Sequence, residues 1–186
     1  MTAADPTDHH FLRYERNTTP LPQLVGSCKG VVLELGPGMG NQLFFLDKTK
    51  VTRVVGIECN PNFVPEVQAQ IRERGLEDIY ELVLGGVEDA DLLARHGVTP
   101  GSLDTVLSTG VLCSVPDPDA IAREMYMMLK PGGRLIFWEH HRSPDWATAI
   151  SQCKYHFCEA MDFLLIWDGV QRCGIPCGGP LSVVAT

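Results

Sequence analysis

The chain has 186 residues, of which 45% are apolar and 20% are charged, and its formal net charge is −8 at pH 7. This length provides one substantial core and leaves no room for a second full domain, so we expect a single domain over residues 1–186. The negative charge opposes a phosphate backbone, and no cluster of Lys and Arg with interleaved aromatics occurs, so we expect no nucleic-acid partner.

The amino-terminal segment, residues 1–29, begins with a polar and acidic stretch from Met1 to Asp8. A secretory signal would instead place a basic segment before an apolar one, so we expect no such signal. We expect this segment to form a lid or cap on a core that spans residues 30–141.

The core begins with a glycine turn that follows an apolar strand. Residues 31–35 are typical of a buried strand of a parallel sheet, and Gly36, Gly38 and Gly40 follow at alternate positions. Alternate glycines let the backbone turn sharply and approach a ligand closely, and we expect the next helix to begin near Asn41. The dehydrogenase fingerprint counted from the first glycine requires glycine where Asn41 stands, which disfavours a nicotinamide oxidoreductase.

A second strand ends in a carboxylate. Residues 53–57 are apolar in character, and Glu58 follows them 22 residues after the first glycine of the turn. A carboxylate at that distance suits a ribose diol, because it accepts from both hydroxyls at once; the alternative is a solvated loop acid. Asn60 and Pro61 then predict an N-cap and the start of a helix that extends to about residue 74.

The following segments alternate between strand and helix patterns. We expect short helices ending near residues 95 and 129, the second capped by Asp117, and a turn at residues 130–133. The remaining predicted strands are residues 80–84, 103–108 and 134–139. This alternation predicts a doubly wound α/β fold with a mostly parallel sheet.

Several motifs in this order carry a family resemblance. The pattern from Glu34 to Gly40, acid-x-Gly-x-Gly-x-Gly, resembles motif I of the class I S-adenosylmethionine methyltransferases. The segments 111–116, 129–133 and 138–140 resemble the methyltransferase-like thiol methyltransferases of animals and their fungal relatives. The resemblance implies a Rossmann-like methyltransferase fold, S-adenosyl-L-methionine as cofactor and a small-molecule acceptor, with a thiol as first choice and a hydroxyl next.

The resemblance also assigns cofactor contacts to residues at the carboxyl ends of the strands. They are Glu34 for the methionine amine, Gly36, Gly38 and Gly40 beneath the methionine and ribose, Glu58 for the ribose hydroxyls, Val87 and Glu88 for the adenine, and Thr109 and Gly110 for the methionine side. Two of these residues have structural alternatives. Glu34 is otherwise a buried strand acid held by backbone amides, and Glu88 is otherwise a charge at a helix N-terminus.

Two histidines at the end of the fifth strand are the candidates for a catalytic base. His140 is the first choice and His141 the second, because both follow the carboxyl end of the fifth strand, on the side of the sheet where we expect the active site. The alternative is an exposed or capping histidine. A metal site is not expected. Its candidate ligands would be Cys153, Cys158, Cys173, Cys177 and His156, whose spacings do not match structural zinc sites.

The carboxyl-terminal part, residues 142–186, departs from the family. A full domain continues through a helix to a sixth strand and an antiparallel seventh, whereas only 45 residues follow His141. We therefore expect a fold that is shortened at this end, with one edge strand at residues 181–186, which either lies exposed or is covered by a second subunit of a homo-oligomer. This shortening favours the alternative function, a non-catalytic protein of the same fold that binds the cofactor or a partner.

The location expected from the sequence is the cytoplasm. Seven cysteines, an odd number without a signal peptide, suggest reduced thiols. The longest apolar stretch, near Phe163 to Trp167, is too short to span a bilayer.

Overall fold

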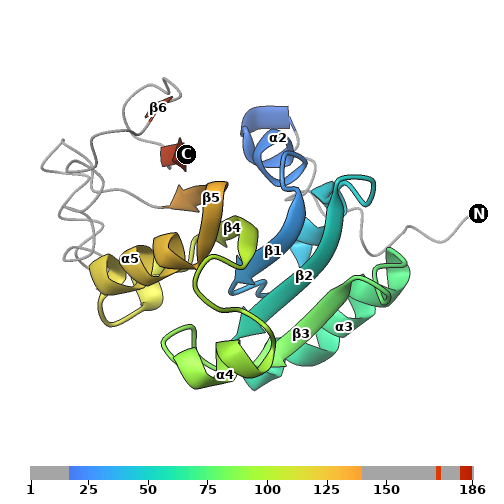
Figure 1. Ribbon diagram of the computed structural model, residues 1–186. Helices are drawn as coiled ribbons and strands as arrows, with labels where there is room; N and C mark the ends of the chain where they lie inside the picture. The colour runs from blue at the N-terminus through green and yellow to red at the C-terminus, as the bar shows by residue number, and fades with distance from the viewer. Residues whose placement is uncertain (1–16, 140–170, 173–180, 186) are drawn as a thin grey trace, which may run out of the picture.

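The computed structural model describes residues 17–139, 171–172 and 181–185, and seven strands in these ranges form one sheet (Figure 1). The strand order is β3-β2-β1-β4-β5-β7-β6. Neighbouring strands from β3 to β5 run parallel, whereas β7 is antiparallel to both β5 and β6. The strands are β1 (Gly30–Leu35), β2 (Val51–Glu58), β3 (Tyr80–Leu84), β4 (Leu103–Thr109), β5 (Leu129–Glu139), β6 (Gln171–Arg172) and β7 (Leu181–Ala185). This order confirms the predicted Rossmann-like, mostly parallel sheet.

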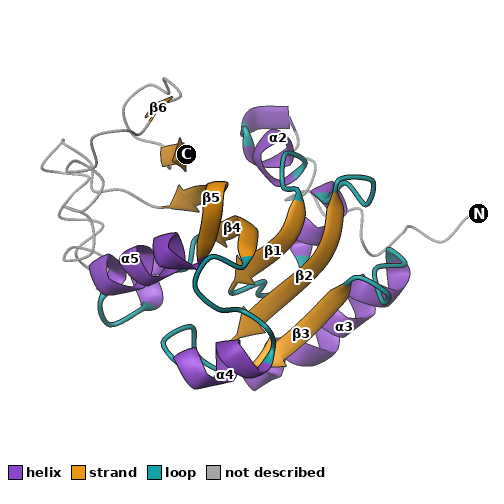
Figure 2. Cartoon of the chain, in the orientation of Figure 1, coloured by secondary structure: helices purple, strands orange, loops and turns teal. Residues whose placement is uncertain are grey.

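Helices cover both faces of this sheet (Figure 2). They are α2 (Leu21–Val25), α3 (Val64–Glu73), α4 (Ala90–Arg95) and α5 (Pro118–Met128), with 3-10 turns η1 (Asn41–Phe45), η2 (Pro61–Phe63) and η3 (Leu112–Ser114). Side chains of α2 and α3 share one buried cluster, and side chains of α4 and α5 share the other. The fold is therefore doubly wound. None of the helices within the described ranges has the length and apolar character needed to cross a bilayer.

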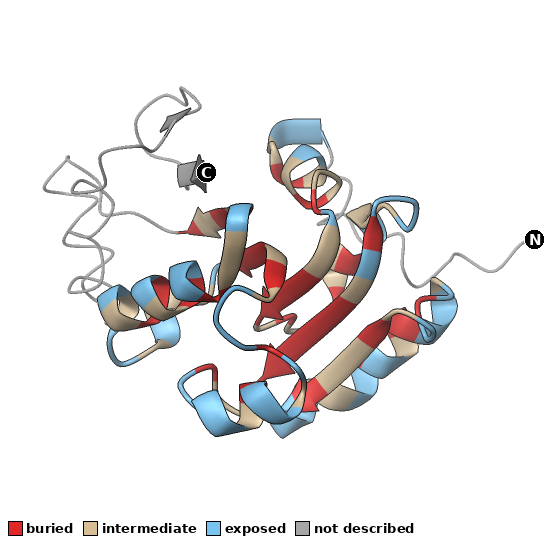
Figure 3. Cartoon of the chain, viewed as in Figure 1, coloured by how far each residue is buried: buried red, intermediate tan, exposed pale blue. Residues whose placement is uncertain are grey.

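Strand β1 lies between β2 and β4 and is buried on both faces (Figure 3). Leu33 and Leu35 point into the cluster of α4 and α5, whereas Val32 points into the cluster of α2 and α3. Glu34 shares the face of Val32, because side chains alternate along a strand. A carboxyl group thus lies in the middle of an otherwise apolar strand, with 1% of Glu34 exposed.

The predicted helix starts agree with the structure, except after the glycine turn. The Asn60 side chain accepts from the Asn62 N–H at 3.0 Å, and the Asp117 side chain accepts from the Ala120 N–H at 2.9 Å, so both predicted caps are confirmed. The helix expected near Asn41 is instead the five-residue 3-10 turn η1. The site therefore has a short, tight connection after its glycines rather than a full helix.

Strand β5 begins earlier than the sequence predicts. The expected turn at residues 130–133 lies inside the strand, because Leu129 pairs with Leu103 while Arg134 pairs with Thr105. Gly132 has φ +78°, which accounts for the irregularity that these residues introduce. The prediction of a separate turn before the strand is thus wrong.

Strand β7 corrects the prediction of a single edge strand at the carboxyl-terminal end. It pairs with β5 on one side, Ile136 opposite Val184, and with β6 on the other, Arg172 opposite Val183. The two-residue strand β6 therefore lies at the edge, and β7 lies inside the sheet. Residues 140–170, which follow β5, lie outside the described residues.

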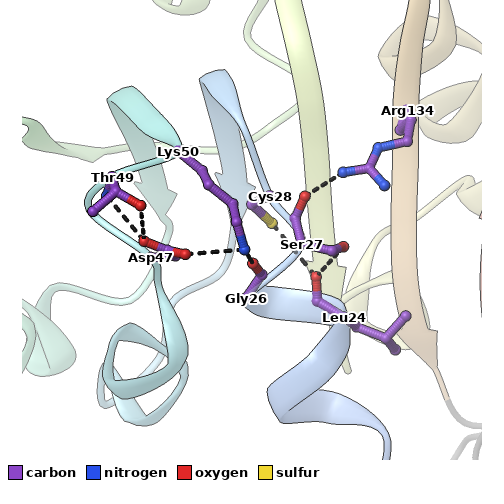
Figure 4. Close-up of polar contacts among 8 residues, drawn as sticks. All are labelled: Leu24, Gly26, Ser27, Cys28, Asp47, Thr49, Lys50 and Arg134. Atoms are coloured by element: carbon purple, nitrogen blue, oxygen red, sulfur yellow. Dashed lines mark hydrogen bonds and ion pairs between the residues drawn. The ribbon is translucent and has the colours of Figure 1, made fainter.

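Polar contacts fix the amino-terminal ends of the strands (Figure 4). Lys50 Nζ donates to the Gly26 carbonyl at 2.9 Å, and the Arg134 guanidinium donates to the Ser27 carbonyl. Cys28 is buried beside them, and this burial raises the pKa of its thiol to about 12, so it remains protonated and unreactive. These contacts stabilise the end of the sheet opposite the glycine turn.

Candidate functional site

The glycine turn follows β1 at the carboxyl edge of the parallel strands. Gly36, Gly38 and Gly40 have φ values of +51°, +57° and +78°, which side chains with a Cβ rarely adopt. A Cβ on Gly36 would lie 2.8 Å from Val111 Cγ2, and one on Gly40 would lie 3.2 Å from Gln70 Cβ. Within the described part of the chain, a Cβ on Gly38 would meet nothing closer than the Gly36 carbonyl oxygen at 3.9 Å. The turn is therefore packed at both ends and open at its middle glycine, where a ligand can approach the backbone.

Glu58 connects this turn to the end of β2. Its Oε2 accepts from the Gly38 N–H at 2.9 Å and its Oε1 accepts from the Asn60 N–H at 2.8 Å, while only 4% of the residue is exposed. The alternative of a solvated loop acid is therefore wrong. Each carboxylate oxygen keeps a further lone pair for a ligand hydroxyl. The sequence did not reveal that Glu58 also fixes the glycine turn.

Glu34 is buried beneath the turn. The Tyr80 hydroxyl donates to Glu34 Oε2 at 2.6 Å, and Oε1 accepts no hydrogen bond from the described part of the chain. Burial raises the pKa of Glu34 to about 7, and the hydrogen bond from Tyr80 opposes that shift. The alternative in which backbone amides hold this acid is not what the structure shows. A buried acceptor without a partner instead fits a hydrogen-bond donor on a ligand.

The loop after β4 is fastened to the end of β5. The Gly110 N–H donates to the Trp138 carbonyl at 2.9 Å, next to the predicted site residue Thr109. Glu139 Oε1 accepts from both the Ser108 hydroxyl at 2.6 Å and the Val111 N–H at 3.0 Å. Because Val111 packs against Gly36, Glu139 supports the glycine turn indirectly. The only signal in the sequence for this role is an acid at the end of a buried strand.

Replacement of Glu139 by alanine is expected to lower the free energy of unfolding by about 1–3 kcal/mol, because the Ser108 hydroxyl of β4 and the Val111 N–H of the loop lose their acceptor. Urea unfolding measures this change, and Glu139→Gln, which keeps one acceptor, should lose less. Glu77→Ala is the matched control, since Glu77 is exposed. A loss no larger than that of the control would contradict this role of Glu139.

Val87 and Glu88 follow β3, in a loop that is joined to the end of β2 by the Gly85 N–H, which donates to the Glu58 carbonyl at 2.9 Å. The two side chains differ in their surroundings. Val87 is 7% exposed and packs in the cluster of α4 and α5, whereas Glu88 is exposed. Asp89 caps α4 by accepting from the Leu92 N–H at 2.8 Å, and Glu88 directly precedes this cap, so the alternative of a charge at a helix N-terminus stays open for Glu88.

His140 and His141 lie outside the described residues, as do the five candidate zinc ligands near the carboxyl terminus. In the part of the chain that is described, no group of three or more His, Cys, Asp or Glu side chains could hold a metal ion. The described candidates converge on one edge of the sheet, around the glycine turn.

Residues 33–137 match the family described as methyltransferase domain. The chain is 36% identical over 123 residues to human thiol S-methyltransferase TMT1B, covering 65% of this chain and 48% of that protein. It is 33% identical over 145 residues to human thiol S-methyltransferase TMT1A, covering 77% of this chain and 54% of that protein. The chain thus spans about half the length of these relatives. The crystal structure of a putative methyltransferase from Bacillus halodurans C-125 aligns with a TM-score of 0.64 at 21% identity, covering 85% of this chain and 71% of that one, which supports the fold.

Proposed function

This chain belongs to the methyltransferase domain family, and on that basis we propose that it is an S-adenosyl-L-methionine-dependent methyltransferase acting on a small molecule. The observation that carries the proposal is the glycine turn, which is open at Gly38, follows the buried Glu34 on β1 and is held by the buried carboxylate of Glu58. That arrangement offers close backbone approach together with two acceptors for hydroxyl or ammonium groups.

The residues present fit this cofactor. Glu34 Oε1, buried without a partner among the described residues, suits the ammonium of the methionine part. A Cβ on Gly38 would occupy the open side of the turn, and Glu58 has lone pairs for the ribose hydroxyls. Thr109 and Gly110 would close the methionine side, and the loop of Val87 and Glu88 would flank the adenine. When bound, the cofactor supplies an electrophilic methyl group on a sulfonium.

The acceptor that we propose first is a thiol, with a hydroxyl next. The support is the similarity to relatives named thiol S-methyltransferase. A thiol with an ordinary pKa of about 8.5 is partly ionised at neutral pH, so the protein chiefly has to orient it and exclude water. The net charge of −8 favours a small acceptor over a nucleic acid.

Turnover tests this proposal against the non-catalytic alternative. The full chain is incubated with S-adenosyl-L-methionine and a panel of small thiols, phenols and amines, and the formation of S-adenosyl-L-homocysteine is measured. We expect product with thiols and less or none with amines. Cofactor binding without product across the whole panel would support the non-catalytic alternative.

His140 is proposed as the base, with His141 as the alternative, because both follow β5 at the edge that carries the glycine turn. Substitution of the acting histidine, His140→Gln or His141→Gln, should slow methylation of a phenol by at least about 100-fold and slow that of a thiol less, because a thiol is already partly ionised. Cofactor affinity should stay unchanged in both variants. Equal rates in both variants and the wild type would exclude a histidine base at these positions.

A further inference from the structure

Tyr80 reaches Glu34 across an intervening strand. It is the first residue of β3, whereas Glu34 lies on β1, and β2 runs between them. A Cβ on Gly56 of β2, the register partner of Glu34, would collide with the Tyr80 hydroxyl and lie 2.7 Å from Tyr80 Cζ. The ring therefore passes directly over Gly56. This close passage explains a glycine in the middle of a buried strand, where it otherwise weakens the sheet.

The hydrogen bond between the two side chains is buried and has a defined direction. Tyr80 is 6% exposed and Glu34 is 1% exposed. Burial raises the pKa of Tyr80 well above its ordinary value, so the phenol keeps its proton and donates. Its single proton goes to Glu34 Oε2, which leaves Oε1 as the acceptor without a partner in the described residues.

Among the described residues, few other groups around Glu34 could control its charge. On the face that Glu34 shares, α2, η1 and α3 contribute apolar side chains and the neutral Gln70. Cys28 lies near enough for Glu34 to help raise its pKa to about 12, and Arg134 of β5 opposes that shift. Glu58, at the end of β2, acts electrostatically on Tyr80. The ionisation of Glu34 therefore depends chiefly on its burial and on the hydroxyl of Tyr80.

We propose that Tyr80 is a positioning residue for cofactor binding: its hydroxyl holds Glu34 so that Oε1 faces the ammonium of the ligand's amino-acid part, and it favours the charged form of Glu34 that binds this ammonium. The inference rests on the function proposed above. It adds the first residue of β3 to a site whose other members lie on β1 or at the carboxyl ends of the parallel strands, and it makes the affinity depend on pH.

The sign of the pH dependence follows from the direction of each shift. Glu34 has a pKa of about 7, so it is mostly protonated below that pH and mostly ionised above it. Affinity for an ammonium ligand should therefore rise as the pH rises through about 7. The Tyr80 hydroxyl lowers the pKa of Glu34, so its removal should move the rise in ligand affinity to higher pH.

The test compares two ligands by calorimetric titration between about pH 6 and about pH 7.5, where an α-amino group stays largely protonated. S-adenosyl-L-homocysteine carries the amino-acid part, and 5′-methylthioadenosine lacks it. The wild type should bind S-adenosyl-L-homocysteine about five- to tenfold more tightly at about pH 7.5 than at about pH 6. It should bind 5′-methylthioadenosine with the same affinity at both pH values. Tyr80→Phe should lower the affinity for S-adenosyl-L-homocysteine about tenfold at neutral pH and move the pH dependence of this affinity to higher pH. The affinity for 5′-methylthioadenosine should stay unchanged.

Two further variants keep the test decisive. Glu34→Gln retains an acceptor for Tyr80 but cannot ionise, so its affinity for S-adenosyl-L-homocysteine should be weak and independent of pH, even if Tyr80→Phe does not fold. Tyr126→Phe is the matched control, because Tyr126 is an exposed tyrosine on α5. If Tyr80→Phe lowered the affinity for both ligands equally, or left the pH dependence of S-adenosyl-L-homocysteine binding unchanged, the proposal would be overturned while the proposed function stayed intact. No binding of either ligand to the folded wild type would overturn both.

Discussion

Replacement of Glu58 by alanine is expected to weaken binding of S-adenosyl-L-methionine by at least about 100-fold, because the carboxylate has two tasks. It accepts from the Gly38 and Asn60 N–H groups, and we propose that it also accepts from the ribose hydroxyls. Hydrogen bonds to a charged group contribute about 1.5–3 kcal/mol each, so loss of the turn's anchor and of the ligand contact together amounts to at least about 3 kcal/mol, which is about 100-fold or more in affinity. Calorimetric titration measures the affinity, and circular dichroism shows whether the sheet remains folded.

Two variants separate the contributions of Glu58. Glu58→Gln keeps one carbonyl acceptor and should lose less affinity than Glu58→Ala. Glu77→Ala removes an exposed acid from the loop before β3 and should bind as the wild type does. If folded Glu58→Ala bound the cofactor as tightly as this control, the proposed ribose contact and the supporting role would both be wrong.

Introduction of a methyl group at Gly38 should abolish measurable cofactor binding while the protein stays folded. The left-handed backbone of Gly38 costs an alanine about 1–2 kcal/mol, but among the described residues the nearest atom to the new Cβ is the Gly36 carbonyl oxygen at 3.9 Å. The methyl group would therefore occupy only the open side of the turn, where we place the ligand. For Gly38→Ala, calorimetric titration measures the cofactor affinity and urea unfolding measures the free energy of unfolding.

Neighbouring glycines provide the matched comparison for Gly38. Gly36→Ala has the same backbone cost and also brings its Cβ to 2.8 Å from Val111, so its free energy of unfolding should fall by about 1–3 kcal/mol more than that of Gly38→Ala. Gly101→Ala, at φ +70° with no atom of the described ranges within 4 Å of the new Cβ, should show the backbone cost alone and unchanged binding. Unchanged binding in Gly38→Ala as well would show that the ligand does not approach the turn there.

The sequence predicts those features that depend on short stretches of chain. The strand before the glycine turn, the caps at Asn60 and Asp117 and the acid at Glu58 all follow from local patterns, and the structure confirms their positions. Each rests on the alternation of buried side chains or on the chemistry of a single residue, which a linear reading can recognise.

Features that depend on register could not be predicted in this way. Tyr80 and Glu34 are 46 residues apart and meet only because β3, β2 and β1 align so that a glycine lies between them. The role of Glu139 likewise requires β5 to pair with β4 in one register. The place of β7 inside the sheet depends on its antiparallel pairing with β5, which no local pattern specifies.

Calorimetric titration of S-adenosyl-L-methionine into the folded wild-type chain shows whether the glycine turn with Glu34 and Glu58 forms a cofactor site. We expect saturable binding of one molecule per chain, displaced by S-adenosyl-L-homocysteine. A folded protein that gives no binding signal with either compound would rule out this site.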